Sequence, residues 1–354
     1  MFSRLVRAGG WLLRSGIQET SGGVSRHYRT DLQRHSPVST EITGYAASAF
    51  VYLHALTGER DFLDAAKRAA LFLARVAWDP ESRSIPFDFG APGLTYFFDC
   101  GIVVRGMLAT WRATGDREFL DVAASLGGAM AEDFGRQGGG YRPVLSLPAK
   151  QPVPPDGHNW STAPGCYQLK AALAWRDLAE ATGDPRFEER YEEALQGALL
   201  SHGSFLPGHP DPHRVMDRLH AFLYFLEGLR PRAGERRCAE AIAKGVPLVE
   251  RLLREIAPRF ERSDVYAQLL RVRLWADEAG ALPLDSEAAR REASILAGFQ
   301  AEVPDKRVDG GFYFGRAGGE TLPHVNPVST AFAVQALALW EQRGNGEQPP
   351  AVFY

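Results

Sequence analysis

The 354-residue sequence predicts an all-α protein that folds as one domain, residues 1–354, with six inner and six outer helices in a closed ring. Three observations predict this fold. Apolar residues recur with helical periodicity in twelve segments, Thr-Gly-acid turns join three pairs of segments, and long links rich in Gly, Pro, His and aromatic residues follow most of the pairs. Length alone would also allow two average domains, so the single ring rests on this pattern.

A Thr-Gly-acid motif occurs at residues 57–59, 114–116 and 182–184, each time between an apolar run and an amphipathic run that begins with an aromatic residue. Glycine after a helical run is suited to the positive φ of a helix C-terminus, and the acid suits the next helix N-terminus. Each motif therefore predicts a tight helical hairpin. The motifs lie farther apart than the roughly 34–47 residues of common helical repeats, so long segments separate the hairpins.

The twelve helical segments fall into two sets. One set is apolar or small on nearly every side, as expected of helices with neighbours on several faces; these predicted inner helices are residues 38–57, 97–113, 163–181, 216–230, 263–279 and 325–342. The other set has one charged face, and these predicted outer helices are residues 2–15, 60–77, 117–134, 186–201, 235–255 and 284–301. The first of them, with its spaced arginines, could alternatively belong to an organelle transit peptide.

The links before the inner helices are long. They span residues 16–37, 78–96, 135–162, 202–215 and 302–324, and each ends where an inner helix begins. Loops of this length are usually functional or disordered, and these are too aromatic to be simple linkers. In a ring they would all open on one side, so we expect a polar pocket there.

Composition and charge narrow the function. An apolar content of 45 % with 23 % charged residues is typical of a compact globular protein, and a net charge of −3 with scattered Lys and Arg offers no surface for nucleic acid. No window approaches the roughly 18 apolar residues of a membrane span. Cys100, Cys166 and Cys238 are isolated, so we expect no disulfide, no metal site, no cofactor and a reducing, cytoplasmic location. Oligomeric state stays open.

Several motifs are typical of one fold group. The Gly-Gly-aromatic segments 139–141 and 310–312, together with the Thr-Gly-acid turns, resemble the turn motifs between helices in the (α/α)6 toroid or six-hairpin glycosidase group. That group includes glucoamylase-like hydrolases, unsaturated glucuronyl hydrolases, N-acylglucosamine epimerases and glucuronyl C5-epimerases. Segment 22–28 followed by 41–45 is similar to proteins associated with bacterial surface-polysaccharide synthesis. The resemblance implies action on sugars, and no particular reaction, because one fold carries many chemistries.

Glu41, Asp99 and Asp264 are the candidate catalytic residues. Each falls in the first turn of a predicted inner helix, directly after a long link, so we expect all three at one rim. Glycoside hydrolysis usually needs one protonated and one ionised carboxyl group across the scissile bond, and two of these three could supply them. A purely structural explanation also exists, because helix dipoles favour first-turn acids by about 0.3–1 kcal/mol.

Other polar and aromatic side chains on the links or first turns are candidates for sugar binding. Aromatic faces can pack on sugar C–H groups, while Arg, Asn and His can bind hydroxyl or carboxylate groups. Core packing is the alternative for the aromatic and histidine members, and an Asx-turn the alternative for the aspartate. The candidates are Arg26, His27, Tyr28, Tyr45, Asp88, Tyr96, His158, Asn159, Trp160, Tyr167, His220, Arg262, Tyr266, His324 and Asn326.

Three functions stay open on this basis. The first is a glycoside hydrolase that acts on a bacterial surface or exo-polysaccharide, with two of the three acids as acid and base. The second is a uronate epimerase or polysaccharide lyase, in which His or Tyr moves a proton and Arg neutralises the carboxylate. The third is a non-catalytic sugar-binding protein of a polysaccharide-synthesis assembly.

Overall fold

The protein is mostly helical in the computed structural model, which describes residues 2–89, 93–137, 139–156, 159–257 and 259–346, together with residues 350, 352 and 354. The chain forms two compact units. Unit 1 contains residues 1–17, 27–35 and 199–349, and unit 2 contains residues 18–26, 36–198 and 350–354. Each unit has its own set of apolar helices packed against helices with a charged face.

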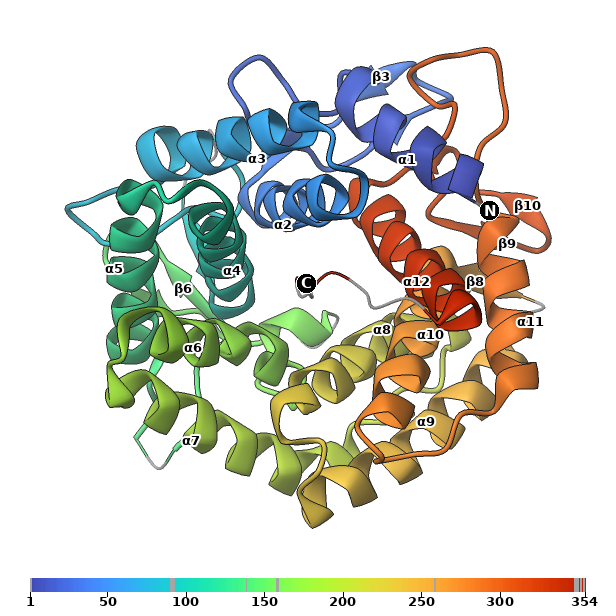
Figure 1. The fold of residues 1–354 in the computed structure, drawn as a ribbon. Coiled ribbons are helices and arrows are strands. Elements are labelled where there is room, and N and C mark those ends of the chain that lie inside the picture. Colours follow the sequence, from blue (N-terminus) through green and yellow to red (C-terminus); the bar gives the residue numbers. More distant parts are fainter. Residues whose placement is uncertain are drawn as a thin grey trace. The chain divides into compact units, whose positions relative to one another are not determined.

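Unit 2 is built from helical hairpins. Its apolar helices pack in the order α2, α4, α6, with α3 against α2 and α5 against both α4 and α6; Figure 1 shows α4 between α2 and α6. The helices are α2 (Thr40–Thr57), α3 (Arg60–Phe72), which continues as the π-helical turn η1 (Leu73–Ala77), α4 (Phe97–Thr114), α5 (Arg117–Phe134), α6 (Gln168–Thr182) and α7 (Pro185–Ser201), whose last residues belong to unit 1.

Short strands tie the links of unit 2 to the helix N-termini. Strand β1 (Val24–Ser25) pairs with β4 (Val38–Ser39), directly before α2, and β5 (Leu94–Tyr96), directly before α4, pairs with β6 (Val144–Ser146), which pairs with β7 (Gln151–Pro152). All three pairings are antiparallel. A short 3-10 helix, η2 (Trp160–Thr162), precedes α6. These pairings hold the starts of α2 and α4 in place.

The three predicted hairpin turns are confirmed. Gly58, Gly115 and Gly183 each have a φ of 73°, and their backbone N–H groups donate to carbonyls of the preceding helix over 2.7–2.9 Å. This left-handed backbone is accessible to glycine at little cost. The glycines therefore end one helix and let the next begin within three residues.

Unit 1 has the same kind of construction. Helix α10 packs between α8 and α12, as Figure 1 also shows, while α9 packs against α8 and α10, α11 against α10 and α12, and α1 against α12. The bounds are α1 (Phe2–Arg14), α8 (Pro212–Gly228), α9 (Arg236–Ile256), α10 (Ser263–Glu278), α11 (Ser286–Ala297) and α12 (Pro327–Asn345), with the 3-10 turns η3 (His202–Ser204) and η4 (Arg230–Arg232).

Two small antiparallel sheets lie in the links of unit 1. One has the order β10 (Glu320–Thr321), β9 (Gly315–Ala317), β8 (Phe260–Arg262), and the other has the order β11 (His324–Val325), β2 (Tyr28–Arg29), β3 (Arg34–His35). Strand β8 leads directly into α10 and β11 lies just before α12. As in unit 2, the strands set where the apolar helices begin.

Helix α1 is an integrated part of unit 1. Arg7 donates to Asp309 over 2.7 Å, and the indole N–H of Trp11 donates to the carbonyl of Arg307 over 2.8 Å. Trp11 is buried. Residues 2–14 therefore form a packed helix, one residue shorter than the predicted segment 2–15. Within the part of the chain that the structure describes, no helix is both long enough and apolar enough to cross a bilayer.

Two helix starts differ from the predictions by four residues or more. Helix α6 begins at Gln168, not at residue 163, because η2 and the following Pro164-Gly165 occupy the preceding residues. Helix α8 begins at Pro212, four residues before the predicted start, because the Asp211 carboxylate accepts from the His213 N–H over 3.0 Å and proline suits the first helical position.

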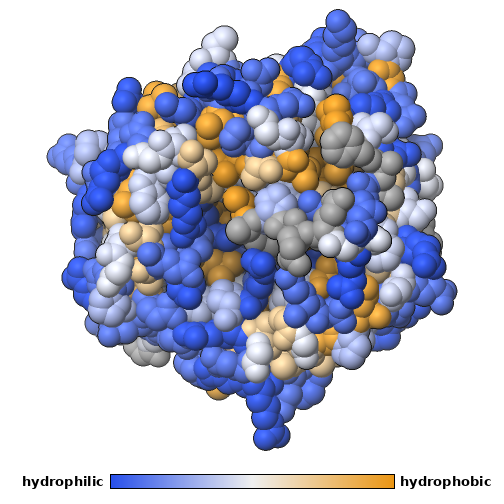
Figure 2. All heavy atoms as spheres, in the orientation of Figure 1, coloured by the Kyte–Doolittle hydropathy of each residue, from blue (hydrophilic) through white to orange (hydrophobic). Residues whose placement is uncertain are grey.

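The surface is polar. Figure 2 shows a face on which hydrophilic side chains predominate and hydrophobic ones form small, separate patches. The large apolar residues that are more than a third exposed are scattered over different elements: Val6, Leu32, Val76, Phe89, Leu200, Ile295 and Val303. Single exposed apolar residues of this kind are normal in globular proteins. The apolar sides of the helices therefore face the cores of the units.

Close backbone approach between α4 and α6 gives a stability test. A Cβ at Gly101 would lie 2.5 Å from the Ala171 carbonyl oxygen, whereas a Cβ at Gly128, also in a helix, would meet nothing within 4 Å. We expect Gly101→Ala to destabilise the protein by about 1–3 kcal/mol through overpacking, and Gly128→Ala to stabilise it by about 0.5–1 kcal/mol. Urea unfolding measures both. Equal effects of the two substitutions would contradict the close packing of α4 on α6.

Candidate functional site

The three candidate acids lie where the sequence places them, in the first turns of α2, α4 and α10. Glu41 and Asp99 both belong to unit 2, whereas Asp264 belongs to unit 1. These carboxyl groups differ in whether an arginine side chain binds them. Asp264 has a bidentate arginine partner, and Glu41 and Asp99 have none among the described residues.

Glu41 and Asp99 form a pair of desolvated carboxyl groups. Asp99 is 5 % exposed and its buried Oδ2 atom has no hydrogen-bond partner among the described residues, while Glu41 is partly exposed. Burial raises the pKa of Glu41 to about 7. Burial and then the nearby charge of Glu41 raise the pKa of Asp99 well above its ordinary value. At neutral pH the pair therefore holds at least one proton.

Arg26 is the cation next to this pair. Its Nη2 donates to Asp88 Oδ1 over 2.6 Å, its guanidinium carbon lies 4.6 Å from the centre of the Phe87 ring, and its backbone N–H donates to Pro37. The charge of Arg26 lowers the pKa of both Glu41 and Asp99, but burial has the larger effect on each. The charge of Arg26 therefore offsets only part of the rise that burial causes in the two pKa values.

Aromatic side chains surround Asp99. The charge of Asp99 contributes, after burial, to raising the pKa of both Tyr96 and Tyr167, which places both rings near its carboxyl. The Tyr96 ring lies 4.8 Å from that of Phe87, and the Tyr167 ring lies 4.8 Å from that of Trp160. The structure therefore brings Arg26, Asp88, Tyr96, Trp160 and Tyr167 into the surroundings of the two acids, as candidates for sugar contacts.

The other candidates of unit 2 have different roles or are not described. Tyr45 is buried within α2, 1 % exposed, and is a core residue. Asn159 donates to Asp156 over 2.7 Å and shapes the link before α6. His158 lies outside the described residues.

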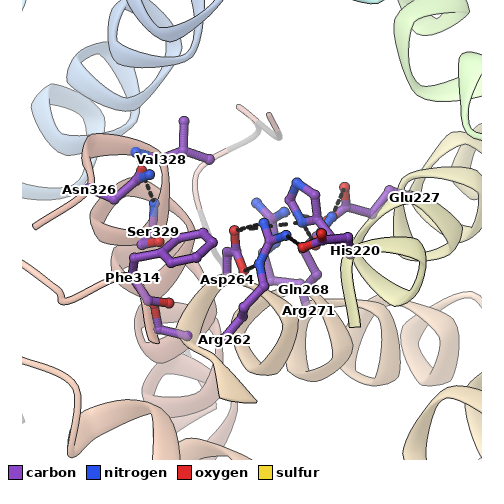
Figure 3. Close-up of polar contacts among 12 residues, drawn as sticks. His220, Glu227, Arg262, Asp264, Gln268, Arg271, Phe314, Asn326, Val328 and Ser329 are labelled. Carbon is purple, nitrogen blue, oxygen red and sulfur yellow. Dashed lines mark hydrogen bonds and ion pairs between the residues drawn. The ribbon is translucent and has the colours of Figure 1, made fainter. Parts of the chain in front are cut away.

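In unit 1, Asp264 forms an ion pair. Arg262 donates to both of its oxygens, over 3.0 and 2.6 Å, and also to Asp217 over 2.7 Å, as Figure 3 shows in part. The charge of Arg262 lowers the pKa of Asp264 despite the burial of this carboxyl. Asp264 is therefore an ionised acceptor, so the environment of unit 1 does not favour it as a proton donor. It suits an orienting role.

His220 of α8 faces this ion pair. Its Nδ1 lies 3.7 Å from Asp264 Oδ2 and 2.7 Å from Gln268 Oε1. Gln268 donates in turn to Glu227 over 3.4 Å, and Arg271 contacts the other oxygen of Glu227 (Figure 3). Burial lowers the pKa of His220 to about 4, although the charge of Asp264 acts in the opposite direction. His220 is thus a neutral imidazole at neutral pH.

The link residues of unit 1 form a stack above Arg262. The guanidinium carbon of Arg262 lies 4.5 Å from the Phe314 ring centre, the Phe314 ring 4.9 Å from His324, and His324 5.0 Å from His27. His27, His324 and Phe314 are partly exposed. The structure therefore joins predicted residues His27, His324, Arg262, Asp264 and His220 in one connected cluster.

The remaining predicted residues of unit 1 serve the scaffold. Asn326 caps α12, accepting from the N–H groups of Val328 and Ser329 (Figure 3). Tyr28 is buried in β2, and Tyr266 donates to Glu261 over 3.2 Å. None of these contacts was evident from the sequence.

Sequence reasoning missed three polar residues inside the apolar helices, namely Glu227, Gln268 and Arg271, all buried. Their signal was available, because a charged residue in a helix that is otherwise apolar all round needs a buried partner. Among the described residues, the structure contains no group of three or more His, Cys, Asp or Glu side chains that could hold a metal ion.

The raised pKa of Glu41 predicts a pH-dependent stability. Its ordinary value is 4.5 and its value in the folded protein about 7, so its contribution is fully present below 4.5 and is lost as the pH rises through 7. We expect the unfolding free energy of the wild type to fall over this range, relative to that of Glu41→Gln, by up to about 3 kcal/mol. Urea unfolding at several pH values measures this.

If the unfolding free energies of wild type and Glu41→Gln change in parallel with pH, the desolvation of Glu41 is contradicted. The control is Glu287→Gln, at the exposed start of α11.

No protein-family model matches the sequence, and no curated protein is significantly similar to it. Solved structures do match. A cellobiose 2-epimerase from Bacillus thermoamylovorans is 13 % identical with a TM-score of 0.74, covering 96 % of this chain and 100 % of that one. A cellobiose 2-epimerase from Spirochaeta thermophila is 17 % identical with a TM-score of 0.72, covering 93 % of each chain. A D-mannose isomerase is 11 % identical with a TM-score of 0.69, covering 97 % of each chain.

At these identities the likeness establishes the fold and leaves the reaction open. The matches extend over nearly the whole of this chain and of each matched structure. The chain therefore has the (α/α)6 toroid fold, which is the fold class predicted from its sequence pattern.

Proposed function

We propose that the protein is a carbohydrate-active enzyme, a glycoside hydrolase in which Glu41 and Asp99 are the acid–base pair. The single observation that carries this proposal is the pair itself: two carboxyl groups without ion-pair partners among the described residues, desolvated and coupled by charge at the starts of α2 and α4. A structural acid at a helix N-terminus would ordinarily be solvated or hydrogen-bonded. Here the Asp99 Oδ2 atom is buried without a hydrogen-bond partner among the described residues, and Glu41 is only partly exposed.

The roles of the two acids follow from their pKa values. Burial and the charge of Glu41 raise the pKa of Asp99 well above its ordinary value, so it is assigned as the general acid that protonates the leaving oxygen. Glu41 is the more exposed group and ionises near pH 7, so it is assigned as the base or nucleophile. Arg26 favours this ionised form through its charge. Asp264 is left with an orienting role because Arg262 holds it ionised.

The substrate is proposed to be a bacterial surface or exo-polysaccharide, or its oligomers. Tyr96 offers an aromatic face near Asp99, Trp160 offers one beside Tyr167, and Asp88 with Arg26 can bind hydroxyl groups. Support for a sugar substrate also comes from the fold, since the matched structures bear the names of cellobiose epimerases and a mannose isomerase. The sequence likeness of segments 22–28 and 41–45 to polysaccharide-synthesis proteins points to a polymer.

A second candidate function, sugar or uronate epimerisation or the related β-elimination, is favoured by His220. It is a neutral imidazole beside an Arg–Asp ion pair, which is the chemistry needed to remove a proton next to a carbonyl. The names of the matched structures favour this candidate as well. The two candidates use different units and are separable by substitution.

Activity assays distinguish these functions. We expect Glu41→Gln and Asp99→Asn each to lower kcat for release of reducing ends from exo-polysaccharide oligomers by about 10²–10⁴-fold, the usual contribution of a positioned acid or base. Glu287→Gln is the matched control, an exposed first-turn glutamate of α11, and should retain full activity. The pH profile should lose activity as the pH rises and Asp99 loses its proton.

Undiminished hydrolysis in both variants would reject the assignment. Carbon-bound proton exchange in heavy water with cellobiose, mannose or uronate oligomers, lost in His220→Asn and kept in Glu41→Gln, would instead establish the second candidate. Sugar binding by the wild type without either reaction would indicate a binding protein.

A further inference from the structure

A chain of buried polar groups crosses the apolar helices of unit 1. It begins at Gln335 of α12, passes through Arg271 and Gln268 of α10 and Glu227 of α8, and ends at His220 of α8. Glu227, Gln268 and Arg271 are 0 % exposed. Burying an ion pair in a core costs more than apolar residues of the same volume would, so this chain calls for a role beyond packing.

The direction of each hydrogen bond in this row of buried polar groups follows from which atoms can donate and which can only accept. Arg271 donates to Gln335 over 2.9 Å and forms an ion pair with Glu227, whose carboxylate can only accept. The Gln268 side chain must therefore turn its NH2 group to Glu227, at 3.4 Å. Its Oε1 then faces His220 Nδ1, at 2.7 Å. Because an amide oxygen can only accept, Nδ1 must carry the proton.

One tautomer of His220 follows from this order. With the proton on Nδ1, the nitrogen that bears the lone pair is Nε2. The charged groups that face the ring, Asp264 and Arg262 from the start of α10 and Glu227 from α8, leave it neutral at neutral pH because burial outweighs them. Figure 3 shows these groups around the ring, with Gln268 between His220 and Glu227.

We propose that Gln268 and Glu227 are positioning residues that hold His220 as the Nδ1-protonated tautomer, so that its Nε2 is a proton acceptor for a sugar hydroxyl or a C–H group next to a carbonyl. The proposal makes unit 1 a second proton-transfer site, separate from the carboxyl pair of unit 2. Only the identity of the abstracted proton rests on the proposed function. The tautomer itself can be measured without any substrate.

Nitrogen NMR of the full-length protein tests the proposal directly. Protein labelled with 15N-histidine, compared with His220→Asn to assign the signals, should show a protonated Nδ1 and an unprotonated Nε2 for His220 at pH 7. Gln268→Leu removes the acceptor and should convert this signal to the other tautomer or to a mixture. Gln268→Glu can restore the relay, because a protonated carboxyl accepts from His220 through one oxygen and donates to Glu227 through the other.

Gln335→Leu is the matched control. It removes a buried amide from the same Arg271, but Gln335 belongs to α12 and lies at the other end of the chain from His220. We expect it to leave the tautomer unchanged while lowering stability, and circular dichroism confirms that each variant is folded. A purely structural role for Gln268 would lower stability and leave the tautomer as it is.

The wild-type spectrum alone can overturn the proposal, even if Gln268→Leu does not fold. A proton on Nε2 of His220 in the wild type, or an unchanged tautomer in folded Gln268→Leu, would reject it. If an epimerase or isomerase activity is found, kcat should fall by about 10-fold or more in Gln268→Leu with KM little changed. Absence of any sugar reaction, with the tautomer as expected, would reject the proposed function and leave this inference standing.

Discussion

Desolvation of ionisable groups at the starts of the apolar helices is the constraint on which the proposed chemistry depends. Asp99 and Asp264 occupy equivalent places, in the first turns of α4 and α10, and both are buried. Asp264 has a bidentate arginine, which lowers its pKa, whereas Asp99 has no such partner among the described residues and burial raises its pKa. The difference lies in one neighbouring cation, since Arg26 pairs with Asp88 and only moderates Glu41 and Asp99.

Most of the helical scaffold was accessible from the sequence because it depends on local signals. The apolar periodicity predicted every one of the twelve helices found in the described residues, and glycines such as Gly58 and Gly115 marked the turns by their need for positive φ. The strands were not predicted, since pairings of two or three residues, such as β1 with β4, are too short to leave an alternating pattern. The predicted start of α6 was wrong because a 3-10 turn precedes the helix, and a turn of only three residues is also too short to leave a periodic pattern.

The candidate site was only half predictable. First-turn acids could be picked out because a helix start after a long link is a local feature, and Glu41, Asp99 and Asp264 lie there. The burial that raises the pKa of Asp99 could not, because it depends on how the helices of unit 2 pack. The polar network behind His220 could not either, since the pairing of Arg271 with Glu227 joins residues 44 positions apart and depends on how α8 packs on α10. Arg262, which keeps Asp264 ionised, is by contrast only two residues away in the sequence.

The protonation state of the carboxyl pair is the central claim, and carbon NMR measures it most directly. Selective 13C labelling of carboxyl carbons, with Glu41→Gln and Asp99→Asn to assign the signals, follows each group across a pH titration. We expect Glu41 to titrate near pH 7 and Asp99 to titrate well above its ordinary range. Titration of both groups near pH 4, the ordinary range of solvated carboxyls, would contradict the account.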